Sequence, residues 1–295
     1  MDEPDFNKRL QDCRVAIVGV GLMGGSLGLD LRGRCAARVG VARRPETLAL
    51  ALARGMIDAS ADFDAAAESC DLIILATPPR TILAQLHALA QRPASGSAPK
   101  LVLDLGSTKT DIVAAMEALP AGFDPVGGHP MCGKEASGVA AAEAGLYQGR
   151  TFILTPLKRT SPGALSLACE LVAAVGARPL VLGAAQQDAL VAQISHLPYL
   201  AAVALVRAAQ AAGDEQVWQV AASGFRDTTR LAASDLTMML DILLTNRAAV
   251  LAALAGYAAE LEQLTRLIDQ GDADALLAAL RPARAKRSEL FTWIR

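Results

Sequence analysis

The sequence predicts two domains, an α/β domain built on a parallel sheet and an all-α domain that follows it. Residues 1–182 alternate short β-rich segments with helical stretches of about ten residues, the order expected of βαβ units. After residue 182 no strand-like segment returns, and the patterns that follow are helical as far as a basic tail after residue 280. A length of 295 residues agrees with two domains of roughly 150 residues each. We therefore place the domains at 1–182 and 183–295.

The strands predicted for the first domain are apolar along most of their length, which is typical of strands buried on both faces of a parallel sheet. They cover residues 14–19, 37–42, 71–76, 101–105, 124–127, 151–155 and 178–182. The helices predicted between them cover residues 22–31, 45–54, 81–90 and 108–118, and a loop rich in Pro, Ser and Gly covers 91–100.

Two long helices are predicted for the second domain. The first covers residues 186–210, with Pro198 as a kink or an early break, because proline cannot donate the helical hydrogen bond. The second covers 235–268, with Ser234 as its N-cap, and is followed by a short helix at 273–280; Gly271 fits the end of the second helix. Alanine and leucine surround much of this second helix, more than one core would bury, so we expect a homodimer.

Composition excludes several classes of function. A net charge of −2 and an aromatic content of 4% do not favour binding to nucleic acid or to an anionic membrane. Residues 1–14 are polar and mixed in charge, unlike a signal peptide, and the longest uncharged apolar stretch, 191–206, is shorter than the roughly 20 residues of a membrane span. The five cysteines are scattered without a CxxC pair, which favours reduced thiols in a cytoplasmic protein and no metal site.

A GxGxxG motif ends the first predicted strand and opens the first helix. Gly19 allows a tight turn, Gly21 lets the backbone approach a pyrophosphate, and Gly24 permits close packing of helix against strand. The helix N-terminus then faces the phosphates, so within a βαβ unit the motif predicts a dinucleotide site. The expected cofactor-binding residues are Gly19, Gly21, Leu22, Met23 and Gly24, together with Thr77 and Pro78 at the end of the third predicted strand.

The kind of dinucleotide depends on the end of the second predicted strand. An Asp or Glu there would bind the ribose 2′-hydroxyl of NAD, but this chain has Arg43 and Arg44. Guanidinium groups suit a 2′-phosphate, because they can pair with it through two hydrogen bonds. We therefore favour NADP over NAD; the alternative is that Arg43 only stacks on adenine and either cofactor binds.

Polar residues at four further places are candidates for the reaction. His129 follows a predicted strand near the carboxyl edge of the sheet, and His196 lies on the first long helix of the second domain. A neutral imidazole can take a proton from a hydroxyl group that is being oxidised. Ser107 lies where a strand leads into a helix, and a turn expected between helices holds Arg226 and Arg230, which suit a carboxylate ligand.

These motifs, taken together, resemble a known family. The chain resembles the prephenate/arogenate (cyclohexadienyl) dehydrogenases of tyrosine biosynthesis in several segments, in that family's order, over most of its length. The segments are 19–25 (GVGLMGG), 104–109 (DLGSTK), 127–138 (GGHPMCGKEASG), 154–156 (LTP), 195–198 (SHLP) and 223–230 (SGFRDTTR). The resemblance implies a Rossmann domain followed by a helical dimerisation domain, with the active site in the cleft between them.

The resemblance also implies a reaction, which is an oxidative decarboxylation. Hydride leaves the ring carbon that bears the 4-hydroxyl group and goes to the nicotinamide, and loss of the ring carboxylate as CO2 gives an aromatic product. Prephenate would give 4-hydroxyphenylpyruvate, and arogenate would give tyrosine. The sequence leaves the choice between these two substrates open.

The same resemblance implies roles for five residues. His129 is expected to accept the proton of the 4-hydroxyl group, with Ser107 orienting that hydroxyl and the nicotinamide. Arg230 would bind a substrate carboxylate, and His196 would contact the substrate side chain from the second domain. Glu135 matches an acidic position found in part of the family, and we expect it at the mouth of the pocket.

Two other functions stay open. One is a different dehydrogenase or reductase with a Rossmann domain and a helical domain. The β-hydroxyacid enzymes among these resemble one another in a catalytic lysine on the first long helix of the second domain, and residues 186–210 contain no lysine. The other is a non-catalytic NADP sensor, which would keep the glycine loop but would not need His129, His196 and Arg230 together.

Overall fold

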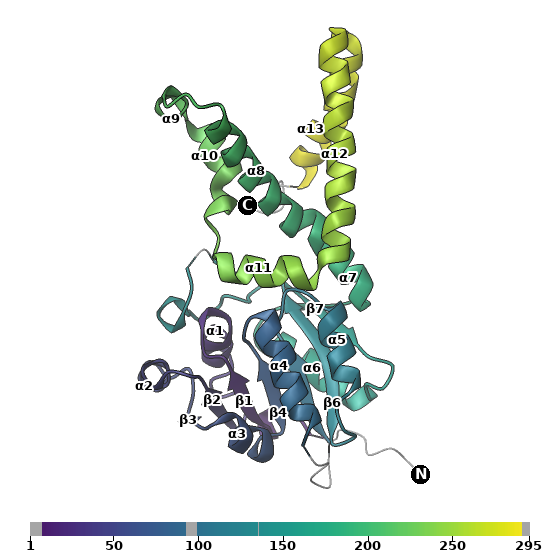
Figure 1. Cartoon of the computed structure of the whole chain (residues 1–295). Helices are drawn as coiled ribbons and strands as arrows, with labels where there is room; N and C mark the ends of the chain where they lie inside the picture. The colour runs from purple at the N-terminus through teal and green to yellow at the C-terminus, as the bar shows by residue number, and fades with distance from the viewer. Residues whose placement is uncertain (1–7, 93–98, 135, 291–295) are drawn as a thin grey trace. The chain divides into compact units, whose positions relative to one another are not determined.

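Figure 1 shows a computed structural model of the chain, in which residues 8–92, 99–134 and 136–290 are described. The chain divides into two compact units, Met1–Arg247 and Ala248–Arg295. The first unit holds the sheet, the helices around it and the helical segments up to residue 247. The domain boundary expected after residue 182 marks the change from sheet to helices, and it stays a prediction.

The first unit is built on one mainly parallel sheet. In the described part of the chain the sheet has eight strands in the order β3-β2-β1-β4-β5-β6-β7-β8. The strands are β1 (Arg14–Val18), β2 (Ala37–Val41), β3 (Ala59–Ser60), β4 (Leu72–Leu75), β5 (Lys100–Asp104), β6 (Phe123–Pro130), β7 (Thr151–Pro156) and β8 (Arg178–Val181). Each neighbouring pair is parallel except β6 with β7. The predicted α/β class is confirmed.

Helices cover both faces of this sheet (Figure 1). They are α1 (Leu22–Asp30), α2 (Pro45–Ala53), α3 (Phe63–Ser69), α4 (Pro79–Ala90), α5 (Thr110–Glu117) and α6 (Pro162–Ala174). Alternate residues of β1 point to opposite faces, so Val15 and Ile17 join one buried cluster while Ala16 and Val18 join the other. Burial on both faces explains why the strands are continuous apolar segments in the sequence.

The pairing of β6 with β7 corrects the expectation of a parallel sheet throughout. The connection at 131–150 contains, among its described residues, only the short 3-10 turn η2 (Val139–Ala141), whereas a parallel crossover usually needs a helix. β6 is also longer than predicted, so His129 lies within the strand, paired with Ile153, and not after it. The elements β3, α3 and α6 are additional to those predicted.

The first long helix predicted after residue 183 is present as three consecutive segments. α7 (Ala184–Val191) continues into a π-helical turn, η3 (Ala192–His196), and then into α8 (Leu197–Ala211). The π-helical turn lies directly before Pro198, whose missing N–H favours a change of hydrogen bonding there. By length and composition alone Ala184–Ala211 could span a membrane, a test that the core helices of soluble proteins also pass.

The helices after α8 depart further from the prediction. They are α9 (Gln216–Val220), α10 (Ser223–Thr229), the 3-10 turn η4 (Arg230–Ala233), α11 (Leu236–Thr245) and α12 (Arg247–Gln270). The turn expected at 223–230 is therefore helical, and the helix expected at 235–268 is interrupted at Asn246. The N-cap of α11 is Asp235 rather than Ser234, because the Asp235 side chain accepts a hydrogen bond from the backbone N–H of Met238.

The second unit consists of the remainder of α12 and of α13 (Ala273–Leu290). Gly271 follows α12 with a φ of 67°, so the predicted end of this helix is confirmed. α13 extends well beyond the short helix expected at 273–280 and continues through Pro282.

Candidate active site

The glycine loop lies between β1 and β4, where the strand order of the sheet reverses. Gly19 has a φ of 101°, and a Cβ atom there would lie 2.7 Å from the carbonyl oxygen of Ala76. Its N–H donates to the carbonyl oxygen of Val41, at the end of β2, over 2.8 Å. In open α/β sheets, ligands bind outside the carboxyl ends of the strands at such a reversal.

The start of α1 fits a dinucleotide. Gly21 is the N-cap with open space where a Cβ would stand, and no side chain caps the helix, so its first backbone N–H groups are available to a phosphate. At Gly24 a Cβ would lie 2.1 Å from the carbonyl oxygen of Gly19, so only glycine lets the helix pack this closely. Arg43 and Arg44 follow β2 at the same edge and are exposed. These groups fit NAD or NADP.

The end of β4 completes this side of the site. The Cγ2 atom of Thr77 would lie 2.7 Å from a Cβ at Gly19, so Thr77 is packed against the glycine loop. Its Oγ1 donates to Oε1 of Gln85 over 2.9 Å, and Pro78 is the N-cap of α4. The cofactor residues expected from the glycine loop and from the third predicted strand are therefore neighbours.

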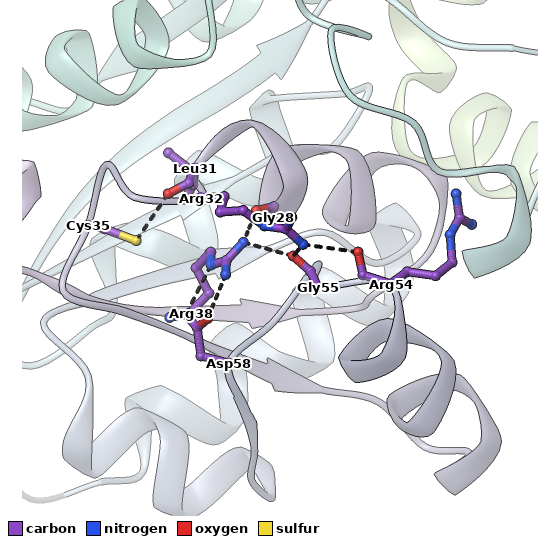
Figure 2. A network of polar contacts seen from close by, with 8 residues as sticks. All are labelled: Gly28, Leu31, Arg32, Cys35, Arg38, Arg54, Gly55 and Asp58. Atoms are coloured by element: carbon purple, nitrogen blue, oxygen red, sulfur yellow. Dashed lines mark hydrogen bonds and ion pairs between the residues drawn. The ribbon is translucent and has the colours of Figure 1, made fainter.

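Two arginines tie together the end of α1, the strand β2 and the segment after α2 (Figure 2). Arg38 on β2 donates to the carbonyl oxygens of Gly28 over 2.7 Å and Gly55 over 3.0 Å, and it lies 2.5 Å from Oδ1 of Asp58. Arg32, which follows α1, donates to the same Gly55 carbonyl over 2.7 Å. The hydrogen bond from Arg38 holds the pKa of Asp58 below its usual value. This network fixes α1 relative to β2 and to the end of α2.

A buried ion pair lies at the carboxyl end of β5. Nζ of Lys109 binds Oδ2 of Asp104, and both side chains are fully buried. Asp104 also accepts hydrogen bonds from the backbone N–H of Gly106 over 2.7 Å and of Gly128 over 2.9 Å, so it ties the ends of β5 and β6 together. Burial raises the pKa of Asp104 and lowers that of Lys109, and the attraction between the two opposes both shifts.

His129 lies on β6 next to this ion pair. Its side chain is largely buried, and its Nδ1 atom is fully buried without a hydrogen-bond partner. Burial lowers the pKa of His129 to about 3; the positive charge of Lys109 adds to this shift, and the side chain of Gln187 opposes it. The imidazole is therefore neutral at pH 7 and able to accept a proton.

The start of α7 brings two polar side chains to the same edge. Asp188 accepts hydrogen bonds from the backbone N–H of Lys109 over 2.7 Å and of Thr110 over 2.8 Å, so it caps α5 from another helix. Gln187, which is fully buried, donates from Nε2 to the carbonyl oxygen of Ser107 over 3.3 Å and to Oδ1 of Asp188 over 3.0 Å. The backbone at Ser107 is thus held by α7.

His196, at the end of the π-helical turn, is buried beside these groups. Nδ2 of Asn246 lies 3.2 Å from Nδ1 of His196 and donates to the carbonyl oxygen of Asp188 over 2.9 Å. Because an amide nitrogen only donates, Nδ1 of the neutral His196 is the acceptor and Nε2 carries the proton. Burial lowers the pKa of His196 to about 4, and Asp188 opposes the shift. A positive charge on His196 would also lower the pKa of His129.

Comparison with known proteins identifies the family. Residues 27–181 match the family model described as the nucleotide-binding domain of prephenate dehydrogenase, and residues 183–282 match the model of its dimerization domain. The prephenate dehydrogenase of Bacillus subtilis (strain 168) is 33% identical over 285 residues, which cover 94% of this chain and 76% of that protein. The chain belongs to the prephenate dehydrogenase family.

Two solved structures of this family agree with the fold. The prephenate dehydrogenase of A. aeolicus, in complex with hydroxyphenyl propionate and NAD+, has a TM-score of 0.88 at 34% identity and covers 96% of this chain and 100% of its own. Synechocystis arogenate dehydrogenase has a TM-score of 0.81 at 32% identity, with 94% and 99% covered. The chain is thus an oxidoreductase with an NAD(P)-binding Rossmann domain. These comparisons support the enzyme and not the non-catalytic sensor or another dehydrogenase class.

In this member of the prephenate dehydrogenase family, the residues expected at the site fall into two groups, one at the strand ends and η3 and the other on α10 and η4. Ser107 follows β5 and His129 lies on the neighbouring strand β6, while His196 ends η3. The helix before η3, α7, binds the carbonyl oxygen of Ser107 through Gln187. Arg226 and Arg230 lie on α10 and η4, which pack against α8, and Arg226 forms an exposed ion pair with Asp227 over 2.9 Å. Glu135 lies outside the described residues. Among the residues that are described, no group of three or more His, Cys, Asp or Glu side chains is placed to hold a metal ion.

Five further site residues were not assigned a role from the sequence. They are Asp104, Lys109, Gln187, Asp188 and Asn246. Asp104 and Lys109 belong to the segment that contains Ser107, and two charges around an apolar strand end are a signal that could have found them. Gln187 and Asp188 are polar residues at the start of a long apolar helix, which is a weaker signal. Asn246 carries none, because its partners are distant in the sequence.

Proposed function

We propose that this protein catalyses the oxidative decarboxylation of prephenate, of arogenate or of both, with NAD(P)+ as the hydride acceptor. The observation that carries this proposal is the buried, neutral His129 at the same sheet edge as the glycine loop. β1, β4, β5 and β6 are parallel, so the residues at their carboxyl ends share one edge. A base beside a nicotinamide site is what the oxidation of a hydroxyl group requires.

In this reaction His129 accepts the proton of the ring 4-hydroxyl group while the carbon that bears it is oxidised. Bound NAD(P)+ supplies the acceptor for the hydride that leaves the same carbon. The ring carboxylate leaves as CO2, its bonding electrons complete an aromatic phenolate, and His129 returns the proton to the phenolate oxygen. Because aromatisation is strongly downhill, the protein mainly needs to orient the substrate and remove one proton. Ser107 orients the hydroxyl group beside His129.

The remaining site residues are proposed to bind the substrate. Arg230 pairs with a substrate carboxylate through charge-assisted hydrogen bonds, and Arg226, one helical turn earlier, adds a second guanidinium group on the same side. His196 donates from Nε2 to the substrate side chain, a role supported by the hydrogen bond between its Nδ1 and Asn246. Glu135 is proposed at the pocket mouth, where a carboxylate favours the ammonium group of arogenate.

Two finer features belong to the same proposal. Arg43 and Arg44, exposed after β2, support a preference for NADP over NAD, because they can bind a 2′-phosphate. The match of residues 183–282 to a dimerization domain supports a homodimer. Apolar side chains exposed on the last helices support it too; they include Leu251, Leu261, Ile268, Leu277 and Leu280.

The proposed reaction is tested by one set of assays on the purified protein. Prephenate and arogenate are each supplied with NAD+ or NADP+, and formation of the reduced cofactor is followed by its absorbance. We expect turnover with one or both substrates, faster with NADP+, and a loss of at least about 100-fold in kcat for His129→Asn. Bound cofactor without turnover in all four combinations would overturn the assignment. Turnover that favours NAD+ would overturn only the preference for NADP.

A further inference from the structure

Gln187 has its amide orientation fixed by its neighbours. Its Nε2 faces two oxygens, the carbonyl of Ser107 at 3.3 Å and Oδ1 of Asp188 at 3.0 Å. The Asp188 carboxylate also accepts hydrogen bonds from the backbone N–H groups of Lys109 and Thr110, so it acts as an acceptor here. Turning the amide over would bring its oxygen against two acceptors, so the nitrogen must face them and Oε1 must point away.

Two complementary atoms remain without partners in this region. Oε1 of Gln187 is a buried acceptor with no donor, and Nδ1 of His129 is a buried nitrogen with no partner. Buried polar atoms are nearly always paired, so two such atoms on neighbouring side chains are expected to satisfy each other. The Gln187 side chain is close enough to act on the imidazole, because it raises the pKa of His129 against the effect of burial.

We propose that Gln187 is the positioning residue of the catalytic base: its Oε1 accepts the proton on Nδ1 of His129 and leaves the lone pair of Nε2 free to receive the substrate proton. Because His129 is the base only in the function proposed above, this role rests on that function. The contact joins both candidate catalytic residues, since the same amide holds Ser107 through its carbonyl oxygen.

A neutral amide suits the charges around His129. Lys109, from the start of α5, and His196, on η3, both lower its pKa when they carry charge, and Asp104 on β5 is already paired with Lys109. On α7, Asp188 is engaged with the start of α5. A carboxylate in place of Gln187 would stabilise the imidazolium, so the base would be lost to protonation at a higher pH. The amide fixes the tautomer without adding a negative charge, and burial keeps His129 neutral.

The direct test reads the tautomer of His129 and needs no turnover. The full chain is labelled with 15N-histidine, and the signals of its three histidines are assigned with His→Asn variants. We expect the neutral His129 to carry its proton on Nδ1, and Gln187→Met to move it partly or fully to Nε2. The control is Gln186→Met, the same change on an exposed neighbour in α7. A wild-type proton on Nε2, or a tautomer unchanged by Gln187→Met, would overturn the proposal.

A kinetic test separates positioning from a merely structural role. Gln187→Met should lower kcat roughly 10–100-fold with a small change in KM, because the base spends time in the wrong tautomer. Gln187→Glu should move the acidic limb of the kcat/KM profile to higher pH by about one unit or more, which Gln187→Met should not do. Equal losses in the two variants with no shift of the limb would overturn the role. A wild type without turnover would refute the proposed reaction. The measurement of the His129 tautomer would then be the test that decides whether Gln187 contacts His129.

Discussion

His129 and His196 are buried as neutral imidazoles, and this links the chemistry of the site to the stability of the fold. The folded pKa values, about 3 for His129 and about 4 for His196, are set mainly by burial. In an unfolded chain a histidine titrates near 6.5. Between these values the unfolded chain binds more protons than the folded one, so protonation favours unfolding.

We expect the free energy of unfolding to fall as the pH is lowered from about 6.5 towards 4. The stability that the two neutral histidines provide is complete above the unfolded pKa and is lost as the pH approaches the folded values. Urea unfolding at pH 7, 6 and 5 measures this slope. His129→Asn and His196→Asn should each reduce it, whereas His87→Asn, at an exposed position, should leave it unchanged. A slope that neither variant alters would contradict the burial of both imidazoles.

The ion pair beneath His129 allows a second prediction at this scale. Lys109→Met leaves Asp104 buried without its cation, which should cost about 3–5 kcal/mol. Burial raises the folded pKa of the unpaired Asp104 above its unfolded value of about 4, so the variant should lose further stability as the pH rises above 4. Thermal unfolding at pH 4.5 and 7 measures both effects.

The control for that prediction is the double variant, in which Asp104→Asn is combined with Lys109→Met. Asp104→Asn keeps an oxygen that can accept from Gly106 or Gly128, and it removes the unpaired charge. We expect the double variant to be more stable at pH 7 than Lys109→Met alone. Equal stability of the two would mean that the loss arises from packing around the lysine chain and not from the charge on Asp104.

Which single residues could be predicted depends on where their partners lie. His129 and Ser107 belong to short polar motifs at strand ends, so the sequence indicates them. Asn246 acts on His196 from 50 residues further along the chain, and Asp188 caps a helix that begins 78 residues before it. Such partners are set by tertiary packing, and one sequence read locally contains no periodicity or motif that reveals them.

At the scale of elements, agreement is closest where local geometry dominates. An apolar strand followed by glycines, each with its own steric requirement, predicts β1, the glycine loop and α1. The structure contains all three where the sequence predicts them. The prediction of one uninterrupted helix at 235–268 is wrong, because the apolar periodicity continues across residue 246 while the structure breaks the helix there. The Asn246 side chain instead binds Asp188 and His196. The expectation that β7 runs parallel to its neighbour β6 is wrong for a similar reason, since the direction of a strand depends on how the connection before it folds.

The glycines of the loop allow a prediction that separates packing from cofactor binding. Gly24→Ala would put a Cβ 2.1 Å from the carbonyl oxygen of Gly19, so it should destabilise the first unit by about 1–3 kcal/mol. Gly21→Ala has open space and a φ of −96°, so the melting temperature should hold while affinity for the cofactor falls at least about tenfold. Thermal melts and NADPH fluorescence titrations measure the two effects. Normal cofactor affinity in Gly21→Ala would mean that the phosphates bind elsewhere.

At the scale of the whole molecule, the sequence correctly predicts a sheet followed by helices, because the two periodicities of the apolar residues differ. The mainly parallel sheet gathers the carboxyl ends of β1, β4, β5 and β6, and with them the proposed cofactor and proton-transfer groups, at one edge. The last two helices differ from the rest, because apolar side chains on them remain exposed in a single chain. Such a surface is expected to be covered by a partner. A second copy of the chain is the partner that the dimerization-domain match indicates.

The proposed dimer gives a prediction at this scale. Leu261 and Ile268 are 46% and 65% exposed and lie two turns apart on one face of α12, so paired Leu261→Glu and Ile268→Glu changes place two charges on that face. We expect the wild type to have about twice the 30.6 kDa mass of one chain by light scattering, and the variant to be monomeric or to dimerise only at higher concentration. The control is Leu52→Glu, at a similarly exposed leucine on α2. A monomeric wild type would overturn the proposed dimer. A variant that remains dimeric would show that the interface does not include this face of α12, because burying two unpaired charges there would cost more free energy than the contact provides.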